Sequence, residues 1–163
     1  MTPSHLSRDL RTATTPDMTR RRWVIGLSIV NAAVGALVGA YQTGIIRHLP
    51  DPPGPFDADR VDASDYAYKR LSSGDGLLMM TTFAATAVLA GIGGADRAEE
   101  KPWVPIALAA KSAYDVVTAA QLAQEEWQTN RALCAYCQGA SVLTLVVAAL
   151  TLPEAARAMR SLV

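Results

Sequence analysis

The chain has 163 residues, which suits a single domain, and its formal net charge is zero. Half of the residues are hydrophobic and only 18% are charged, whereas about a quarter of a soluble domain is charged. This composition argues against a soluble protein and gives no sign of nucleic-acid binding. The two cysteines are too few for a disulfide-stapled secreted domain or for a four-ligand zinc site. We therefore expect no metal centre.

The first part of the chain predicts a polar tail followed by a membrane helix. Residues 1–19 are rich in Thr, Ser and Pro and are expected to be a flexible cytoplasmic tail, with one domain over 20–163. Residues 23–46 carry no charge and are long enough to cross a membrane as a retained helix. Gly35 and Gly39 form a GxxxG spacing that allows close helix contact, although small residues are common in such helices.

The next segment, residues 47–75, predicts a polar connection. Its several prolines forbid a regular helix at its start, and Ser64 or Asp62 could cap a short helix lying on the membrane surface as a lid. Its aspartates suggest a cation site, but they lack the spacing of an EF-hand calcium loop, so a solvated acidic loop is the preferred interpretation. These aspartates are Asp57, Asp59, Asp62 and Asp65.

Three further apolar runs, at about 76–95, 103–122 and 132–152, complete the prediction of an all-α, integral membrane four-helix bundle, with a short polar loop, QEEWQTNR, between the last two runs. Four spans place both termini and the 96–101 loop on one side, which holds nine basic residues against five on the other. Basic residues favour the cytoplasm. We therefore expect a multi-pass plasma membrane protein with cytoplasmic termini. The nine are Arg8, Arg11, Arg20, Arg21, Arg22, Arg97, Lys101, Arg157 and Arg160.

The two cysteines, Cys134 and Cys137, open the fourth predicted span on its extracytoplasmic side. This spacing brings the sulfurs onto neighbouring turns, and a helix N-terminus lowers a thiol pKa by favouring the thiolate. A thiolate attacks disulfides and electrophilic quinones. The position is accessible both to exported proteins and to quinones dissolved in the bilayer, so we expect a redox pair. The alternative is two small buried apolar residues.

A charged pair interrupts the third predicted span. Lys111 and Asp115 are four residues apart and share one helix face, and charges at this depth usually face the protein interior. They are interpreted as a neutralising pair that locks helix packing or, somewhat less favoured, as a proton path or quinone contact. Asp115 lies nearer the cysteines and is the better candidate for supplying protons.

Several segments carry a resemblance to a known family. LCAYCQGAS (Leu133–Ser141) resembles the active-site segment of the vitamin K epoxide reductase family, and TGIIRHLPDPP, FDADRVDASD and LAAKSAYD are similar to compact bacterial members. The resemblance extends over roughly residues 20–160. It implies four spans, a long first extracytoplasmic loop with a short helix, and a redox pair that opens the fourth span.

The resemblance also implies an activity. Family members pass electrons between extracytoplasmic thiol proteins and a membrane quinone, here menaquinone or ubiquinone. Cys134 would exchange with the partner, such as a thioredoxin-like protein, and Cys137 would face the quinone. Candidates to contact the quinone are Thr81 or Thr82, Ser141, Asp115 and Tyr136. Hydroxyl groups in helices more often bond to their own backbone, and Tyr136 would serve equally as an interfacial anchor.

The chain departs from the family pattern in one respect. Typical members carry a second cysteine pair in the first extracytoplasmic loop, but residues 47–75 contain no cysteine. Either a separate protein engages Cys134 directly, or this branch of the family has changed substrate. A second hypothesis is a non-catalytic quinone- or lipid-binding membrane subunit of a larger complex. A plain helical scaffold is a weaker third hypothesis.

Overall fold

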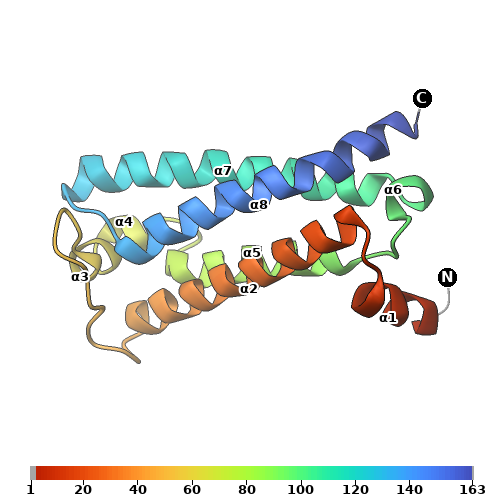
Figure 1. Cartoon of the computed structure of the whole chain (residues 1–163). Coiled ribbons are helices and arrows are strands. Elements are labelled where there is room, and N and C mark those ends of the chain that lie inside the picture. Colours follow the sequence, from red (N-terminus) through yellow and green to blue (C-terminus); the bar gives the residue numbers. More distant parts are fainter. Residues whose placement is uncertain (1–2, 163) are drawn as a thin grey trace.

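The computed structural model describes residues 3–162, and every regular element within them is a helix, which confirms the predicted all-α class. Four long helices run alongside one another (Figure 1): α2 (Pro16–Gln42), α5 (Asp75–Gly91), α7 (Trp103–Asn130) and α8 (Ala135–Arg160). The short helices are α1 (Pro3–Thr12), α3 (Ala58–Asp62), α4 (Asp65–Tyr68) and α6 (Arg97–Glu100). Both termini lie at one end of the bundle, and α3 and α4 lie at the other.

The helix bounds differ from the expected spans at both ends. Residues 3–12 of the expected flexible tail form α1, and α2 begins at Pro16 because the Thr15 hydroxyl accepts a hydrogen bond from the Met18 N–H at 3.3 Å. Residues 1 and 2 of that tail lie outside the described part. Helix α7 continues eight residues past the expected end at 122, to Asn130. The polar segment expected to be a loop after the third span is therefore helical.

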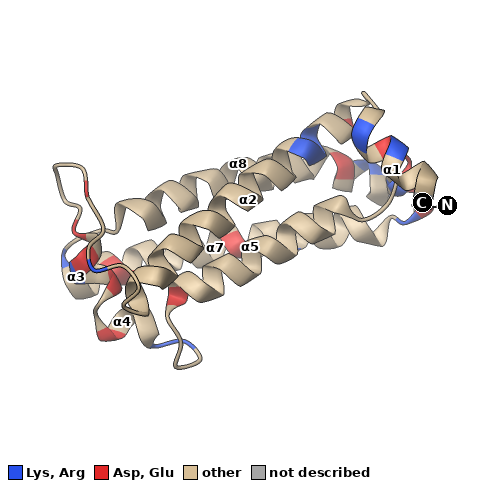
Figure 2. Ribbon diagram, turned by 90° about the horizontal axis from the view of Figure 1, so that it is seen from below, with Lys and Arg blue, Asp and Glu red and all other residues tan. Residues whose placement is uncertain are grey.

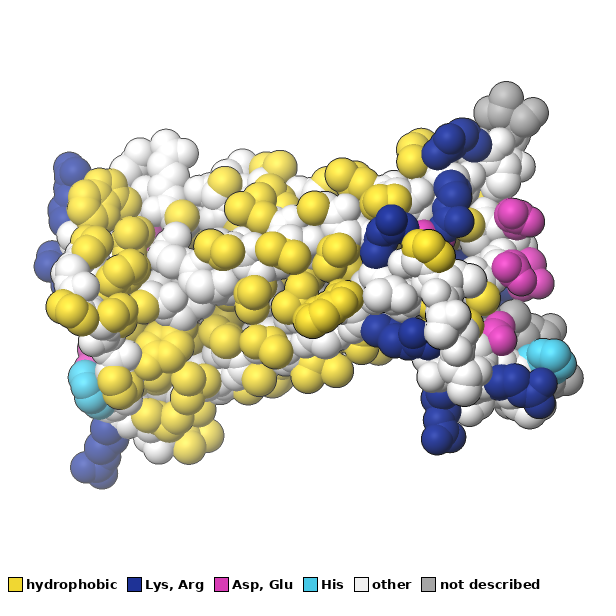
Figure 3. Space-filling view, in the orientation of Figure 1, with side chains coloured by type: hydrophobic (Ala, Val, Ile, Leu, Met, Phe, Trp, Pro, Cys, Tyr) yellow, Lys and Arg dark blue, Asp and Glu magenta, His cyan; other side chains and the backbone are white. Residues whose placement is uncertain are grey.

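Two of the long helices, α2 and α8, are long and apolar enough to cross a membrane. Helix α5 is apolar but has 17 residues. Hydrophobic side chains cover the middle of the bundle, while Lys and Arg side chains gather towards its ends (Figure 3). A lipid environment would cover such a band. Its exposed members include Ile29, Val30, Leu37, Val88, Tyr114, Val117, Val142, Leu145, Val146 and Leu152.

The GxxxG spacing on α2 forms a close contact with α5. A Cβ atom added to Gly35 would lie 2.5 Å from the backbone nitrogen of Met80 and 2.8 Å from the carbonyl oxygen of Gly76. One added to Gly76 would lie 2.5 Å from the Gly39 nitrogen. The two backbones are therefore in contact, and the small residues serve packing within the chain.

Replacing Gly35 with alanine is expected to lower the free energy of unfolding by about 1–3 kcal/mol, because the new methyl group meets backbone atoms that cannot yield without separating α2 from α5. Gly26→Ala on the same helix is the matched control, since no atom lies within 4 Å of its added Cβ. Among the wild type and the two variants, purified in detergent, Gly35→Ala should have the lowest midpoint temperature of thermal unfolding. Equal midpoints for the two variants would contradict the close packing.

Two buried arginines donate hydrogen bonds to the carbonyl groups at the C-terminal end of α5. The Arg21 guanidinium donates to carbonyl oxygens in residues 90–94 at 2.8–3.1 Å. Arg97 donates to the carbonyls of Leu89, Ala90 and Ile92 and forms two hydrogen bonds, each of 2.7 Å, with Glu154 of α8. A helix end leaves carbonyls without intrahelical donors. These two arginines, counted above among the basic residues of the cytoplasmic side, therefore satisfy buried carbonyls.

Residues 47–74, called here the cap segment, cover the N-terminus of α8. Leu49, Val61 and Tyr66 pack with Cys134 in one buried cluster. Asp57 caps α3 by accepting from the Arg60 N–H at 3.0 Å, while Ser64 precedes α4 but donates to the Val61 carbonyl. The predicted short helix of the lid is thus two short helices packed onto the end of the bundle.

Candidate functional site

The cysteine pair lies where α7 turns into α8. Cys134 is the residue before α8, and its sulfur accepts a hydrogen bond from the Cys137 N–H at 3.2 Å. Its own N–H donates to the carboxylate of Glu126 on α7. Both cysteines are free thiols, Cys134 fully buried and Cys137 partly exposed. The spacing thus produces the expected arrangement, with the first sulfur capping the helix that carries the second.

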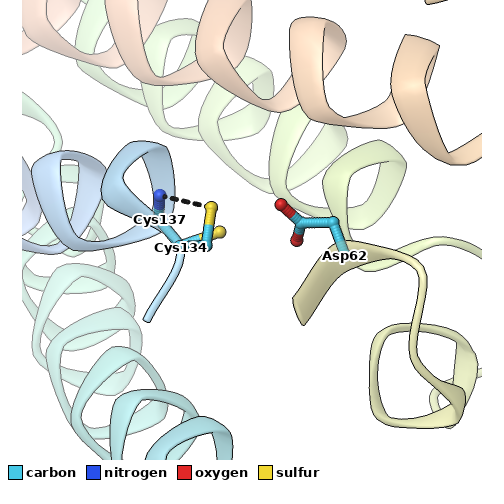
Figure 4. A group of neighbouring side chains, drawn as sticks. All are labelled: Asp62, Cys134 and Cys137. Carbon is cyan, nitrogen blue, oxygen red and sulfur yellow. Dashed lines mark hydrogen bonds between the residues drawn. The ribbon is translucent and has the colours of Figure 1, made fainter. Parts of the chain in front are cut away.

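The third group beside the sulfurs is Asp62, the last residue of α3. One carboxylate oxygen of Asp62 and the sulfurs of Cys134 and Cys137 lie within 4.8 Å of one another (Figure 4). The side chain is 1% exposed, and within the described residues neither carboxylate oxygen receives a hydrogen bond from an N–H group. Figure 4 shows the carboxylate directed towards the cysteine pair.

The site changes the acidity of these groups. Burial raises the pKa of Asp62 to about 7, although a hydrogen bond with Cys134 opposes the shift. The hydrogen bond with Cys137 lowers the pKa of the Cys134 thiol, but burial and the charge of Asp62 outweigh it and leave that pKa above its ordinary value. The expected lowering of the thiol pKa by the helix N-terminus is therefore not the net effect, because burial and, after it, the charge of Asp62 disfavour the thiolate.

The interpretation of the aspartates as a solvated acidic loop is wrong for Asp62. Helix α3 buries Ala58 and Val61 against the bundle, and this turns Asp62 inward as well. Asp59 instead accepts from the Leu49 N–H at 2.9 Å and pairs with His48 at 2.5 Å. Within the described residues, the cluster of metal-binding side chains at Asp62 has three members, Asp62, Cys134 and Cys137, and a closed zinc site needs four ligands. The expectation of no metal remains a prediction.

A cavity of about 240 Å³ lies beside the cysteine pair, between α5, α7 and α8. Cys137 and Asp62 contribute to its wall, while Cys134 does not. Most of the wall is apolar and comes from residues such as Leu78, Met79, Phe83, Ala119 and Leu122. Pockets for drug-sized ligands have volumes of roughly 300–1,000 Å³. The space therefore suits a single ring system, with any long tail outside.

Three of the predicted quinone-contacting residues line this cavity, namely Thr82, Ser141 and Asp115. The Ser141 hydroxyl donates to the Cys137 carbonyl at 2.8 Å. Thr81 lies outside the cavity, exposed and bonded to the Leu77 carbonyl at 2.9 Å. Tyr136 also lies outside, and its hydroxyl donates to the Pro50 carbonyl of the cap segment at 2.7 Å.

The charged pair on α7 ties that helix to α5. The Lys111 ammonium group donates to Asp115 at 2.6 Å, to the Thr82 carbonyl at 2.8 Å and to the Thr86 hydroxyl at 2.5 Å. The packing interpretation therefore accounts for Lys111, which joins two helices. Asp115 keeps a place in the cavity wall, so the two interpretations are compatible.

Sequence reasoning missed Glu126, which was placed in a polar loop. The residue is 3% exposed, and besides Cys134 it accepts from the Gln138 side chain at 3.1 Å. A signal was present, because Asp115, Ala119, Leu122 and Glu126 recur every three to four residues, as on one helix face. All four line the cavity.

Comparisons with known proteins identify one family. The model described as "Vitamin K epoxide reductase family" matches residues 22–152, which include both cysteines and most of the bundle. No curated protein and no solved structure matches the chain.

Proposed function

Because the chain belongs to the vitamin K epoxide reductase family, we propose that it couples the Cys134–Cys137 dithiol/disulfide to a membrane quinone. Members of this family are oxidoreductases of the membrane. Oxidised Cys134–Cys137 takes two electrons and two protons from a partner dithiol, whose disulfide forms as the enzyme's own disulfide breaks. The reduced pair then passes two electrons and two protons to the quinone.

The observation that carries this proposal is the unequal surroundings of the two sulfurs. Cys137 borders a largely apolar cavity of about 240 Å³, while Cys134 lies outside it under the cap segment. One cysteine thus adjoins a space for a ring, and the other faces the end of the bundle. This supports quinone contact at Cys137 and exchange with a protein at Cys134.

The distribution of charge supports the proposed membrane orientation. Lys and Arg gather at the end that holds the termini, and acidic residues gather at α3 and α4 (Figure 2). With α2, α5, α7 and α8 crossing the plasma membrane, the basic end faces the cytoplasm. The cysteine pair then lies near the extracytoplasmic surface.

An extracytoplasmic thioredoxin-like protein is the proposed electron donor. The cap segment contains no cysteine that could relay electrons, so the donor must reach Cys134 itself. Leu49, Val61 and Tyr66 pack in one buried cluster with Cys134, which is fully buried. Exchange therefore requires the cap segment to move aside while the partner is bound.

The proposal is tested by following the redox state of the pair in native membranes. Reduced membranes are treated with a quinone, quenched with acid and labelled with a thiol reagent that slows migration on a gel. We expect quinone to convert two labelled thiols to none, and Cys134→Ser to keep its single label. A pair that never changes state would instead indicate the non-catalytic quinone- or lipid-binding subunit.

A further inference from the structure

Removing the proton from Cys134 needs a group of the protein. A thiol must become a thiolate before it can attack another sulfur. The Cys134 side chain has no exposed surface, so bulk water does not reach it while the cap segment is closed. A base must therefore lie within the site.

The carboxylates near Cys134 differ in how many of their oxygens already accept hydrogen bonds. Both oxygens of Glu126 accept hydrogen bonds, from the Cys134 N–H and from Gln138. Both oxygens of Asp59 are engaged, with His48 and Leu49. Asp75 accepts from the Gln42 amide at 2.6 Å. Asp62 alone among these four has two oxygens that no N–H group satisfies.

Asp62 also borders the cavity that is proposed to hold the quinone. It lies within 4.8 Å of the sulfurs and contributes to the wall of the cavity that Cys137 borders. Building on the proposed function, we infer that Asp62 takes the proton from the Cys134 thiol and delivers it to the quinone bound in that cavity.

In this step the reduced cysteine pair gives two electrons and two protons to the quinone. The Asp62 carboxylate accepts the Cys134 proton, and the resulting thiolate forms the S–S bond with Cys137. The two electrons released pass to the quinone. Its oxygens receive two protons, that of the Cys137 thiol and the one carried by Asp62, which returns to its ionised form. Two thiols and one quinone thus become one disulfide and one quinol.

The surroundings of Asp62 suit a group that both accepts and releases a proton. Burial and nearby negative charges bring its pKa to about 7, and proton transfer is most efficient when the pKa lies near the working pH. Titratable or charged groups face the site from every packed element. They are Tyr41 of α2, Asp51, Asp59, Tyr66 and Arg70 of the cap segment, Asp75 of α5, Glu126 of α7, and Cys134 and Cys137.

The test compares Asp62→Asn with Asp65→Asn, a matched loss of charge at an exposed position of the cap segment. In single-turnover quinone reduction by the pre-reduced protein at pH 7, we expect Asp62→Asn to be slower by about 10²-fold or more, and Asp65→Asn to be unchanged. The wild-type rate should rise with pH through about 7 as Asp62 ionises, and this inflection should vanish in Asp62→Asn. Asp62→Glu, which keeps a carboxyl group, should recover part of the rate and guards against misfolding.

A second measurement separates proton transfer from a purely electrostatic role. Thiolate absorbance in the Cys137→Ser background should show that Asp62→Asn lowers the pKa of Cys134, because a neighbouring negative charge is lost. If Asp62 only supplied charge, Asp62→Asn would therefore react faster than wild type, and that result would overturn the inference.

Oxidation of the reduced pair by the small oxidant diamide makes the test independent of quinone. Asp62→Asn should be slower there too. If the wild type fails to reduce quinone while Asp62→Asn still slows the diamide reaction, the role of Asp62 as proton acceptor stands and the quinone assignment falls. An equal diamide rate in both proteins would contradict the inference itself.

Discussion

Cys137→Ser is expected to lower the rate of quinone reduction by about 10⁴-fold or more, because a serine hydroxyl can neither form a disulfide with Cys134 nor give up electrons. The structure makes this the most direct test, since Cys137 is the cysteine that borders the cavity. The measurement is quinol formation by purified protein in detergent, with a dithiol as electron donor. Full activity in this variant would refute the assignment of the redox pair.

Two companion variants sharpen the result. Cys134→Ser should lose turnover equally, because both sulfurs are needed for the disulfide. Binding of a quinone to the cavity should weaken more in Cys137→Ser than in Cys134→Ser, because only Cys137 lines the wall. Ala149→Ser, at an exposed position on α8, controls for the effect of adding a hydroxyl group to that helix and should keep wild-type activity.

The largest expected loss of stability comes from Arg97→Met. The guanidinium is fully buried, forms two hydrogen bonds with Glu154 and satisfies three carbonyls at the end of α5. Removing one partner of a buried ion pair leaves the other charge unpaired and costs about 3–5 kcal/mol. The midpoint temperature of thermal unfolding, followed by tryptophan fluorescence, should fall by about 10 °C.

The matched control for this variant is Arg160→Met, which removes an exposed arginine near the same end of the bundle and should change the free energy of unfolding by less than about 0.5 kcal/mol. The double variant Arg97→Met, Glu154→Gln should recover part of the loss, because no charge is then left buried without a partner. Similar midpoints for Arg97→Met and Arg160→Met would show that the buried pair contributes little.

Much of the framework could be predicted from local patterns. Long apolar runs, three of them uncharged and the third interrupted by one charged pair, predict the helices seen as α2, α5, α7 and α8. The spacing of Cys134 and Cys137 at the start of such a run predicts a pair of sulfurs near a helix N-terminus, as observed. The four-residue spacing of Lys111 and Asp115 likewise predicts their ion pair.

The predicted ends of the helices differ from the observed ends wherever a helix continues into polar residues. The low hydropathy of the Gln and Glu residues after Leu122 predicts a loop, yet α7 extends through them to Asn130. Its buried face contacts α8 through Glu126, whose carboxylate accepts from Cys134 and Gln138. Those partners lie beyond the helix in sequence, so only the packed structure shows why a charged residue is buried there.

Local sequence patterns predict the four long helices, the neighbouring pair of cysteines and the end of the bundle where that pair lies, because each depends on residues a few positions apart. Only the packing of distant segments shows that Asp62 faces the sulfurs, that Thr82, Ser141 and Asp115 share a cavity with Cys137, and that Arg97 is buried with Glu154. Asp62 and Cys134 are 72 positions apart. Their contact follows from how the cap segment folds back over α8, which no local periodicity records.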